Sequence, residues 1–147
     1  MKSEFMLEAI REAEKSLASG DVPVGAVIVK DGEIISRAYN MREAGLSATA
    51  HAEICAVEQA CKKLKTRRLS GCEMYVTLEP CPMCAGAILM SGIDCVYFGA
   101  YEEKFGAVGS RFNLFYDFNI CRKVSFRGGI MEKECAALMK DFFEELR

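Results

Sequence analysis

Apolar residues recur every three or four positions in three separated stretches of the chain, which is the spacing of an amphipathic helix. This spacing predicts helices over residues 4–19, 51–64 and 131–146. A fourth helix is predicted over residues 82–91, where a proline occupies the first turn. Gly20 follows the first helix and is expected to end it.

Shorter apolar runs, rich in β-branched and aromatic residues, predict strands between these helices. The Asp31-Gly32 pair joins two such runs and indicates a hairpin. The five expected strands cover residues 24–30, 33–40, 73–78, 94–100 and 122–127. Helices and strands alternate after the hairpin, which is typical of helices packed on both faces of a mixed sheet. We therefore expect one domain over residues 1–147, an α/β fold with three α/β/α layers and a central mixed five-stranded sheet.

Composition narrows the class of protein. The 147 residues suit a single hydrophobic core, and no linker-like segment divides them. No apolar run approaches the roughly 18–20 residues of a membrane span, and the charged N-terminus lacks the centre of a signal peptide. A net charge of −2 and a pI of 5.6 argue against a duplex-DNA binder. We expect a cytoplasmic protein with no membrane and no duplex-DNA partner.

Candidate chemistry is concentrated in two short segments. His51 is the only histidine of the chain, and Cys81 and Cys84 form a Cys-x-x-C pair after Pro80. A catalytic zinc site keeps three protein ligands and leaves a fourth position to water. Both segments fall where a helix is predicted to begin, and a helix N-terminus favours thiolates. We therefore predict that His51, Cys81 and Cys84 bind one zinc ion.

Glu53 follows His51 by two positions, so on a regular helix the two side chains point about 200° apart. Both can reach a metal only if it lies beyond the N-terminal end of the helix, near its axis. Glu53 would then neighbour the zinc without being a ligand. A carboxylate there can take a proton from a water that zinc activates and pass it to a leaving group. The pattern indicates hydrolytic attack on an electrophilic carbon, with ammonia leaving if that carbon carries an amine.

The His-x-Glu and Pro-Cys-x-x-Cys segments form the signature of the zinc deaminases. Longer stretches resemble the bacterial tRNA-specific adenosine deaminases: "DVPVGAVIV" (21–29), "TAHAEI" (49–54), "YVTLEPCPMCAGAI" (75–88), "FGAVGS" (105–110) and "ECAALMKDFF" (134–143). The resemblance implies the cytidine-deaminase-like fold, a homodimer and one zinc ion per chain. It also implies hydrolytic deamination of the wobble adenosine of a tRNA anticodon loop to inosine. Asn40 and the Ala52 backbone amide match positions that hold the target nucleotide in that family.

Several positions bear on RNA recognition. The candidate RNA contacts are Glu102, Lys104, Ser110, Phe142 and Phe143. The chain departs from the usual family pattern at Ser47, Gly92, Glu102 and Ile120. None of these departures falls on the predicted zinc ligands. A basic run over residues 61–69 fits a solvated helix end better than an RNA-facing patch.

Three alternatives stay open at the level of sequence. Cys55 could close a structural Cys₃His zinc site, since it shares a helix face with His51. The Cys-x-x-C pair could be a redox centre. A deaminase of free guanine or cytosine would use the same fold and the same site.

Overall fold

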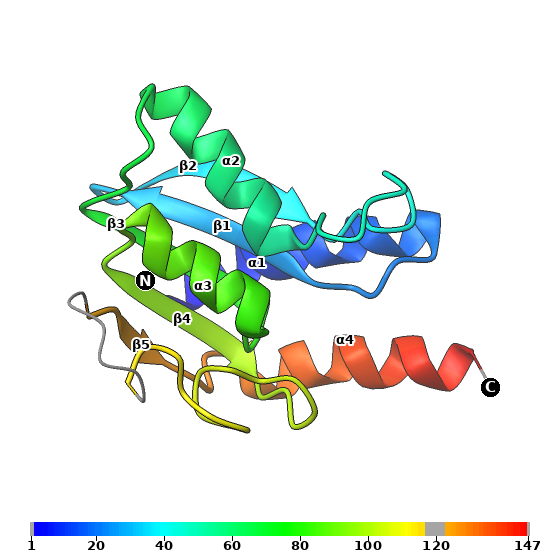
Figure 1. Ribbon diagram of the computed structural model, residues 1–147. Coiled ribbons are helices and arrows are strands. Elements are labelled where there is room, and N and C mark those ends of the chain that lie inside the picture. The colour runs from blue at the N-terminus through cyan, green and yellow to red at the C-terminus, as the bar shows by residue number, and fades with distance from the viewer. Residues whose placement is uncertain (1, 117–122, 147) are drawn as a thin grey trace.

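A five-stranded mixed sheet forms the centre of the molecule in the computed structural model, which describes residues 2–116 and 123–146 (Figure 1). The strand order is β2-β1-β3-β4-β5. The strands are β1 (Gly25–Lys30), β2 (Glu33–Tyr39), β3 (Cys72–Leu78), β4 (Cys95–Ala100) and β5 (Ser125–Arg127). β1 runs antiparallel to β2 and β3, whereas β3, β4 and β5 are parallel. The mixed five-stranded sheet predicted from the sequence is confirmed.

The hairpin between β1 and β2 turns at Asp31 and Gly32, as predicted. Both residues have positive φ, 51° and 78°, as a tight hairpin turn requires. β5 is shorter than its predicted range and its three residues are exposed. Residue 122, where the sequence predicts that this strand begins, lies outside the described residues.

Helices cover both faces of the sheet (Figure 1). α1 (Lys2–Lys15) packs on β1, β2 and β3, and α4 (Glu132–Glu145) packs on β4 and β3. α2 (Ala52–Leu64) packs on β1 and β2 and contacts α3 (Pro82–Ser91). The helix predicted over 4–19 is in fact two pieces, because α1 gives way to a 3₁₀ turn over Ser16–Ser19 before Gly20 ends it.

Two hydrophobic clusters occupy the two faces of the sheet, because side chains alternate along each strand. Ile28 and Met74 pack with α2 and α3, whereas the neighbouring Val27 and Tyr75 pack with α1. The predicted three-layer α/β/α arrangement is therefore confirmed. Among the helices of the described residues, none is both long and apolar enough to span a bilayer.

The ends of several elements meet at one edge of the sheet. β3 and β4 are parallel, so the segments that follow them leave at the same edge. In α/β proteins, ligands bind in the crevice outside the carboxyl ends of such strands. The first turn of α3 follows β3 at this edge, and α4 lies beside it (Figure 1).

Candidate metal centre and substrate pocket

The three predicted zinc ligands lie at two helix starts, as the sequence indicated. His51 is the N-cap residue of α2 and Cys81 is the N-cap residue of α3. Pro82 occupies the first turn of α3, where its missing N–H leaves no hydrogen bond unmade. Cys84 follows within the same first turn and is buried. The two helix N-termini therefore present their unpaired N–H groups to the same small region.

The ligand atoms of His51, Cys81 and Cys84 converge. They all lie within 4.8 Å of one another. His51 Nδ1 is 3.7 Å from Cys81 Sγ and 3.4 Å from Cys84 Sγ. Zinc bonds of about 2.3 Å to sulfur and about 2.1 Å to nitrogen place tetrahedral N and S ligands about 3.6 Å apart. One nitrogen and two sulfurs at these separations fit zinc, and they leave one tetrahedral position for water.

Cys55 is not part of this cluster. Among residues 2–116 and 123–146, the residues whose ligand atoms meet in this way are His51, Cys81 and Cys84. Burial raises the pKa of the Cys55 thiol, helped by Glu58 and Glu53, so this thiol is held in its protonated form. The arrangement therefore disfavours a closed structural site with Cys55 as the fourth ligand.

Hydrogen bonding within the cluster favours one thiolate. The Cys84 thiol and then the His51 ring lower the pKa of Cys81 to about 4, against the effect of burial. The Cys81 sulfur in turn raises the pKa of His51 and the pKa of Cys84. The metal-free cluster thus holds a thiolate at Cys81, the form that binds zinc.

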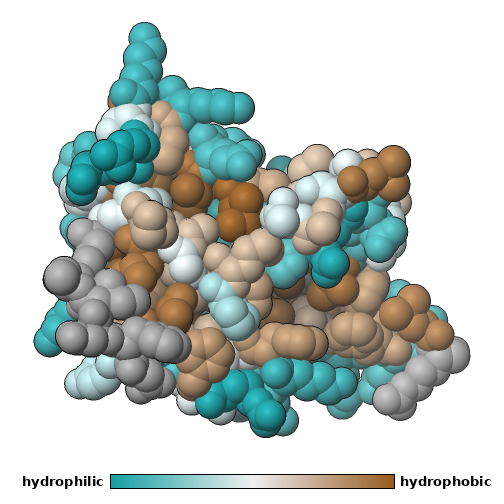
Figure 2. Space-filling model, viewed as in Figure 1, coloured by the Kyte–Doolittle hydropathy of each residue, from teal (hydrophilic) through white to brown (hydrophobic). Residues whose placement is uncertain are grey.

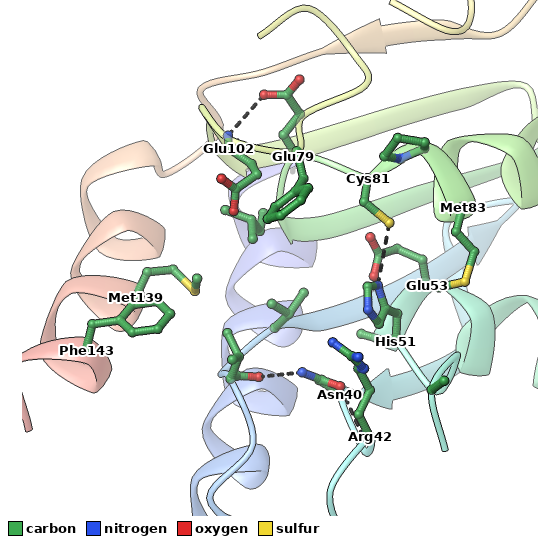
Figure 3. Close-up of a pocket in the computed structure, with 17 residues that line it drawn as sticks. Asn40, Arg42, His51, Glu53, Glu79, Cys81, Met83, Glu102, Met139 and Phe143 are labelled. Atoms are coloured by element: carbon green, nitrogen blue, oxygen red, sulfur yellow. Dashed lines mark hydrogen bonds between the residues drawn. The ribbon is translucent and has the colours of Figure 1, made fainter. Parts of the chain in front are cut away.

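Glu53 lies beside the cluster without belonging to it. Its side chain is 4% exposed, and Figure 3 shows the carboxylate next to His51 and Cys81. Burial raises the pKa of Glu53 to about 7. A carboxyl group with such a pKa can both take up and release a proton at neutral pH. This placement agrees with the geometric expectation for a residue two positions after His51.

A pocket of about 470 Å³ opens in front of the cluster. This volume lies within the range of small-molecule sites, roughly 300–1,000 Å³. Its lining includes Asn40, Ala52 and Glu53 from the predicted set, together with His51 and Cys81. Asn40 is fixed there, because its side-chain amide donates to the Val22 carbonyl at 3.1 Å and its side-chain oxygen accepts from the Arg42 N–H at 3.2 Å.

The candidate RNA contacts divide into two groups. Glu102 and Phe143 line the pocket, and Phe143 is 47% exposed. Lys104, Ser110 and Phe142 are not in the pocket lining, although the Phe142 ring packs edge-on against Phe143. Ser110 instead bonds to a buried carboxylate of the pocket wall.

Other lining residues were not predicted from the sequence, among them Arg42, Glu79, Phe105 and Met139. Figure 3 shows Met139 and Phe143 on α4, facing the metal cluster across the pocket. Glu79 offered a signal, since it is an acidic residue at the end of an apolar strand and directly precedes Pro80. The others come into the pocket from segments whose mutual approach depends on the tertiary fold.

The basic run lies away from the pocket, and of the four departures from the family pattern only Glu102, among the described residues, is in the pocket lining. The basic side chains of 61–69 are exposed, and the hydrophilic region at the top of Figure 2 covers this end of α2. None of them is in the pocket lining. Gly92 caps α3 with a left-handed φ of 86°, and Ser47 lies in the loop before α2. Ile120 lies outside the described residues.

Comparison of the sequence with models of known protein families points to the same kind of site. Residues 1–100 match the model of the cytidine and deoxycytidylate deaminase zinc-binding region. This range contains the metal cluster and Glu53. The chain belongs to this family of zinc-binding deaminases. Zinc is therefore its cofactor, and the predicted resemblance and cytidine-deaminase-like fold are confirmed.

Individual relatives narrow the comparison. The tRNA-specific adenosine deaminase of Bacillus subtilis (strain 168) is 47% identical over 143 residues, which are 97% of this chain and 89% of that protein. A solved structure from work on A-to-I editing by tRNA:A34 deaminases at the wobble position superposes with a TM-score of 0.86 at 39% identity, covering 92% of this chain and 98% of that one. A guanine deaminase from Nitrosomonas europaea superposes with a TM-score of 0.83 at 25% identity, covering 95% and 83%.

Proposed function

We propose that this enzyme deaminates the wobble adenosine of a tRNA anticodon loop to inosine. The observation that carries the proposal is the His51, Cys81 and Cys84 cluster, with Glu53 beside it, in a chain 47% identical to a tRNA-specific adenosine deaminase over nearly its full length. The reaction adds water to the carbon that bears the amino group and releases ammonia. The tRNA anticodon stem-loop is therefore the proposed partner.

Each residue has a distinct role in this proposal. His51 Nδ1 and the sulfurs of Cys81 and Cys84 hold the zinc ion. When bound, zinc supplies a Lewis acid that lowers the pKa of water to around 7. Glu53 takes the proton of the attacking water and passes it to the departing amine, which its burial beside the cluster permits. The Asn40 side chain and the Ala52 backbone N–H hold the base.

Asn40 is suited to that role because its orientation is set before substrate arrives. The Asn40 side-chain NH₂ donates one hydrogen bond to the Val22 carbonyl, and its side-chain oxygen accepts one from the Arg42 N–H. One N–H and one lone pair of the amide stay available to a ligand in the pocket. Such a pre-oriented group discriminates among bases by the hydrogen bonds it can complete.

The substrate assay compares an anticodon stem-loop that carries adenosine at the wobble position with free guanine, cytosine and adenosine. We expect inosine in the stem-loop and no ammonia from the free bases. A stem-loop with guanosine at the wobble position is the matched control and should release no ammonia. Ammonia from guanine with no inosine in the stem-loop would overturn the assignment in favour of a free-base deaminase, the alternative that the likeness to a guanine deaminase supports.

We also propose that the enzyme is a homodimer and that it acts in the cytoplasm. On the face shown in Figure 2, hydrophobic side chains remain visible around α2 and α3, and Met90 of α3 is 81% exposed. An apolar surface of this kind fits a protein partner, here a second copy of the chain. Analytical ultracentrifugation should give twice the chain mass of 16.3 kDa. A monomer at all concentrations that retains full activity would contradict the dimer.

A further inference from the structure

The pocket wall opposite Asn40 and Arg42 is built on a second buried acid, Glu79. Figure 3 shows Glu79 and Glu102 on one side of the pocket and Asn40 and Arg42 on the other. Glu79 is 2% exposed, so its carboxylate has little access to water. A buried charge of this kind is costly unless hydrogen bonds replace its hydration.

The segment after β4 supplies those hydrogen bonds. Glu79 Oε1 accepts the Glu102 backbone N–H at 3.1 Å and also the Ser110 hydroxyl. Oε2 accepts the backbone N–H groups of Val108 and Ser110, each at 3.0 Å. One carboxylate therefore gathers donors from both ends of residues 102–110, which we call the wall segment.

The wall segment shapes the pocket. Its Glu102 and Phe105 are both in the lining, and Phe105 is 65% exposed at the rim. The Ala107 N–H donates to the Pro80 carbonyl at 2.9 Å, which ties the same segment to the chain just before Cys81. The position of Phe105 relative to the metal cluster thus depends on the bonds around Glu79.

Gly106 permits the close approach of the wall segment to Glu79. A Cβ at this position would lie 2.5 Å from the Glu79 carboxylate and would overlap the Glu102 carbonyl oxygen. Any larger residue must therefore push the segment off the carboxylate. The close packing at Gly106 and the four hydrogen bonds to Glu79 are two separate observations, and both show that Glu79 holds the wall segment in place.

We propose that Glu79 is a positioning residue, which fixes the wall segment so that Glu102 and Phe105 form the rim that binds the substrate. Its oxygens are occupied by protein donors, so it does not carry protons in the reaction. The proposal rests on the deaminase function for its kinetic consequence. Its structural consequence, the order of the wall segment, is independent of the substrate.

Glu79→Gln is the principal test. The amide keeps the shape of the side chain, but its NH₂ group must face at least one backbone N–H in either orientation. Because the wall segment is then ordered only part of the time, apparent binding weakens, and we expect KM for the stem-loop to rise about tenfold or more. We expect kcat to change by less than about threefold, with unchanged zinc content and pH profile, because Glu53 and the zinc ligands keep their places.

Amide hydrogen exchange gives the second readout. In Glu79→Gln the backbone N–H groups of Glu102, Val108 and Ser110 should exchange faster than in the wild type, because they lose their acceptor. Gly106→Ala should produce the same pattern by displacing the segment. Glu103→Gln is the matched control, since it makes the same chemical change at an exposed position of the wall segment and should alter neither readout.

Two results would overturn the proposal. If Glu79→Gln had the KM and the amide hydrogen exchange of the wild type, the hydrogen bonds to Glu79 would not be needed to hold the wall segment. A loss of kcat and a changed pH profile, as expected for Glu53, would make Glu79 a catalytic residue instead.

If Glu79→Gln does not fold, Ser110→Ala is the second variant. It removes one hydrogen-bond donor to Glu79 and should give a smaller rise in KM and in amide exchange. No change in either measurement would count against the proposal. Failure of the wild type to edit the stem-loop would reject the substrate and leave the exchange test intact.

Discussion

Two buried carboxylates line the same pocket and differ in their surroundings. Glu79 accepts four hydrogen bonds from the wall segment. Glu53 lies beside a thiolate cluster, and its burial raises its pKa to about 7. The residue type is the same, and the surroundings differ. We therefore propose Glu53 for proton transfer and Glu79 as a positioning residue.

Glu53→Gln tests this division at the residue scale. The amide is isosteric and cannot shuttle a proton, so turnover of the stem-loop should fall by at least about 100-fold. Zinc content, measured by atomic absorption, should match that of the wild type because Glu53 is not among the clustered ligand atoms. Normal turnover in this variant would rule out proton transfer by Glu53, and loss of zinc would indicate that Glu53 is a zinc ligand.

Asp21 anchors the opposite wall of the pocket. Its side-chain oxygens accept from the backbone N–H groups of Glu43 at 2.7 Å and Ala44 at 3.2 Å, next to Arg42. Burial acts to raise the pKa of Asp21, but the hydrogen bonds from Ser19, Glu43 and Ala44 together bring it below its ordinary value of 3.8. Because the folded state favours the ionised form, Asp21 stabilises the fold fully above pH 3.8 and loses this effect as pH falls below it.

Asp21→Asn should therefore lower the free energy of unfolding by about 1–3 kcal/mol near pH 6. The difference from the wild type should be smaller at about pH 3, which lies below the ordinary aspartate pKa of 3.8. Urea denaturation at both pH values measures it. Both proteins carry the same zinc site, so acid release of the metal cancels in the comparison. A difference that stays constant with pH would rule out the ionised carboxylate as its source.

At the scale of elements, close packing between a helix and a strand positions the far wall of the pocket. α4 approaches β4 at Gly99, where a Cβ would overlap the Cys135 side chain and lie 2.9 Å from the Thr77 carbonyl oxygen. α4 carries Met139 and Phe143, which line the pocket. The absence of one side chain in β4 thus allows a helix to reach the site.

Gly99→Ala should push α4 away from the sheet. We expect the free energy of unfolding to fall by about 1–3 kcal/mol, as overpacked cores do. KM for the stem-loop should rise as well, because Phe143 moves. Urea denaturation and steady-state kinetics measure the two effects.

Gly86→Ala in α3 is the control for this change. The nearest heavy atom to a Cβ at this position is 3.9 Å away, so the helix should gain about 0.5–1 kcal/mol. Equal stability of the two alanine variants would show that the contact at Gly99 is not restrictive.

At the scale of the whole molecule, the site joins parts of the chain that are far apart in sequence. The start of α2, the turn after β3, the wall segment and α4 all contribute to one pocket. A zinc ion held by His51, Cys81 and Cys84 would link α2 to α3, which lie on the same face of the sheet. Metal binding would therefore be coupled to the stability of the fold.

Zinc removal by a chelator should lower Tm measured by calorimetry. At a free zinc concentration of about 1,000 times Kd, zinc binding adds ~4 kcal/mol to the free energy of unfolding. This corresponds to a shift in Tm of roughly 10 °C for a protein of this size. Added zinc should restore the wild-type Tm. Cys55→Ala should behave like the wild type, whereas Cys84→Ala should be insensitive to the chelator. Loss of zinc in Cys55→Ala would support the structural Cys₃His site instead.

The amino-acid sequence by itself determined the features that depend on neighbouring residues. The hairpin at Asp31-Gly32, the four helices and the five strands follow from local periodicity and turn chemistry. The candidate zinc ligands also follow, because His51 and the Cys-x-x-C pair combine unusual residue types at a diagnostic spacing. The break of the first helix into a 3₁₀ turn was missed, since its apolar spacing continues through that turn.

Only the tertiary structure decided how distant segments share the pocket. Glu79 meets donors that lie 23 to 31 positions further along the chain, and no local pattern reports such contacts. Phe143 reaches the site because α4 packs against Gly99, a condition set by the sheet and not by the helix. Hydrogen bonds and van der Waals contacts act over a few ångströms in space, whatever the separation in sequence. The candidate reacting groups could therefore be proposed from the sequence, whereas the walls of the pocket could be identified only from the fold.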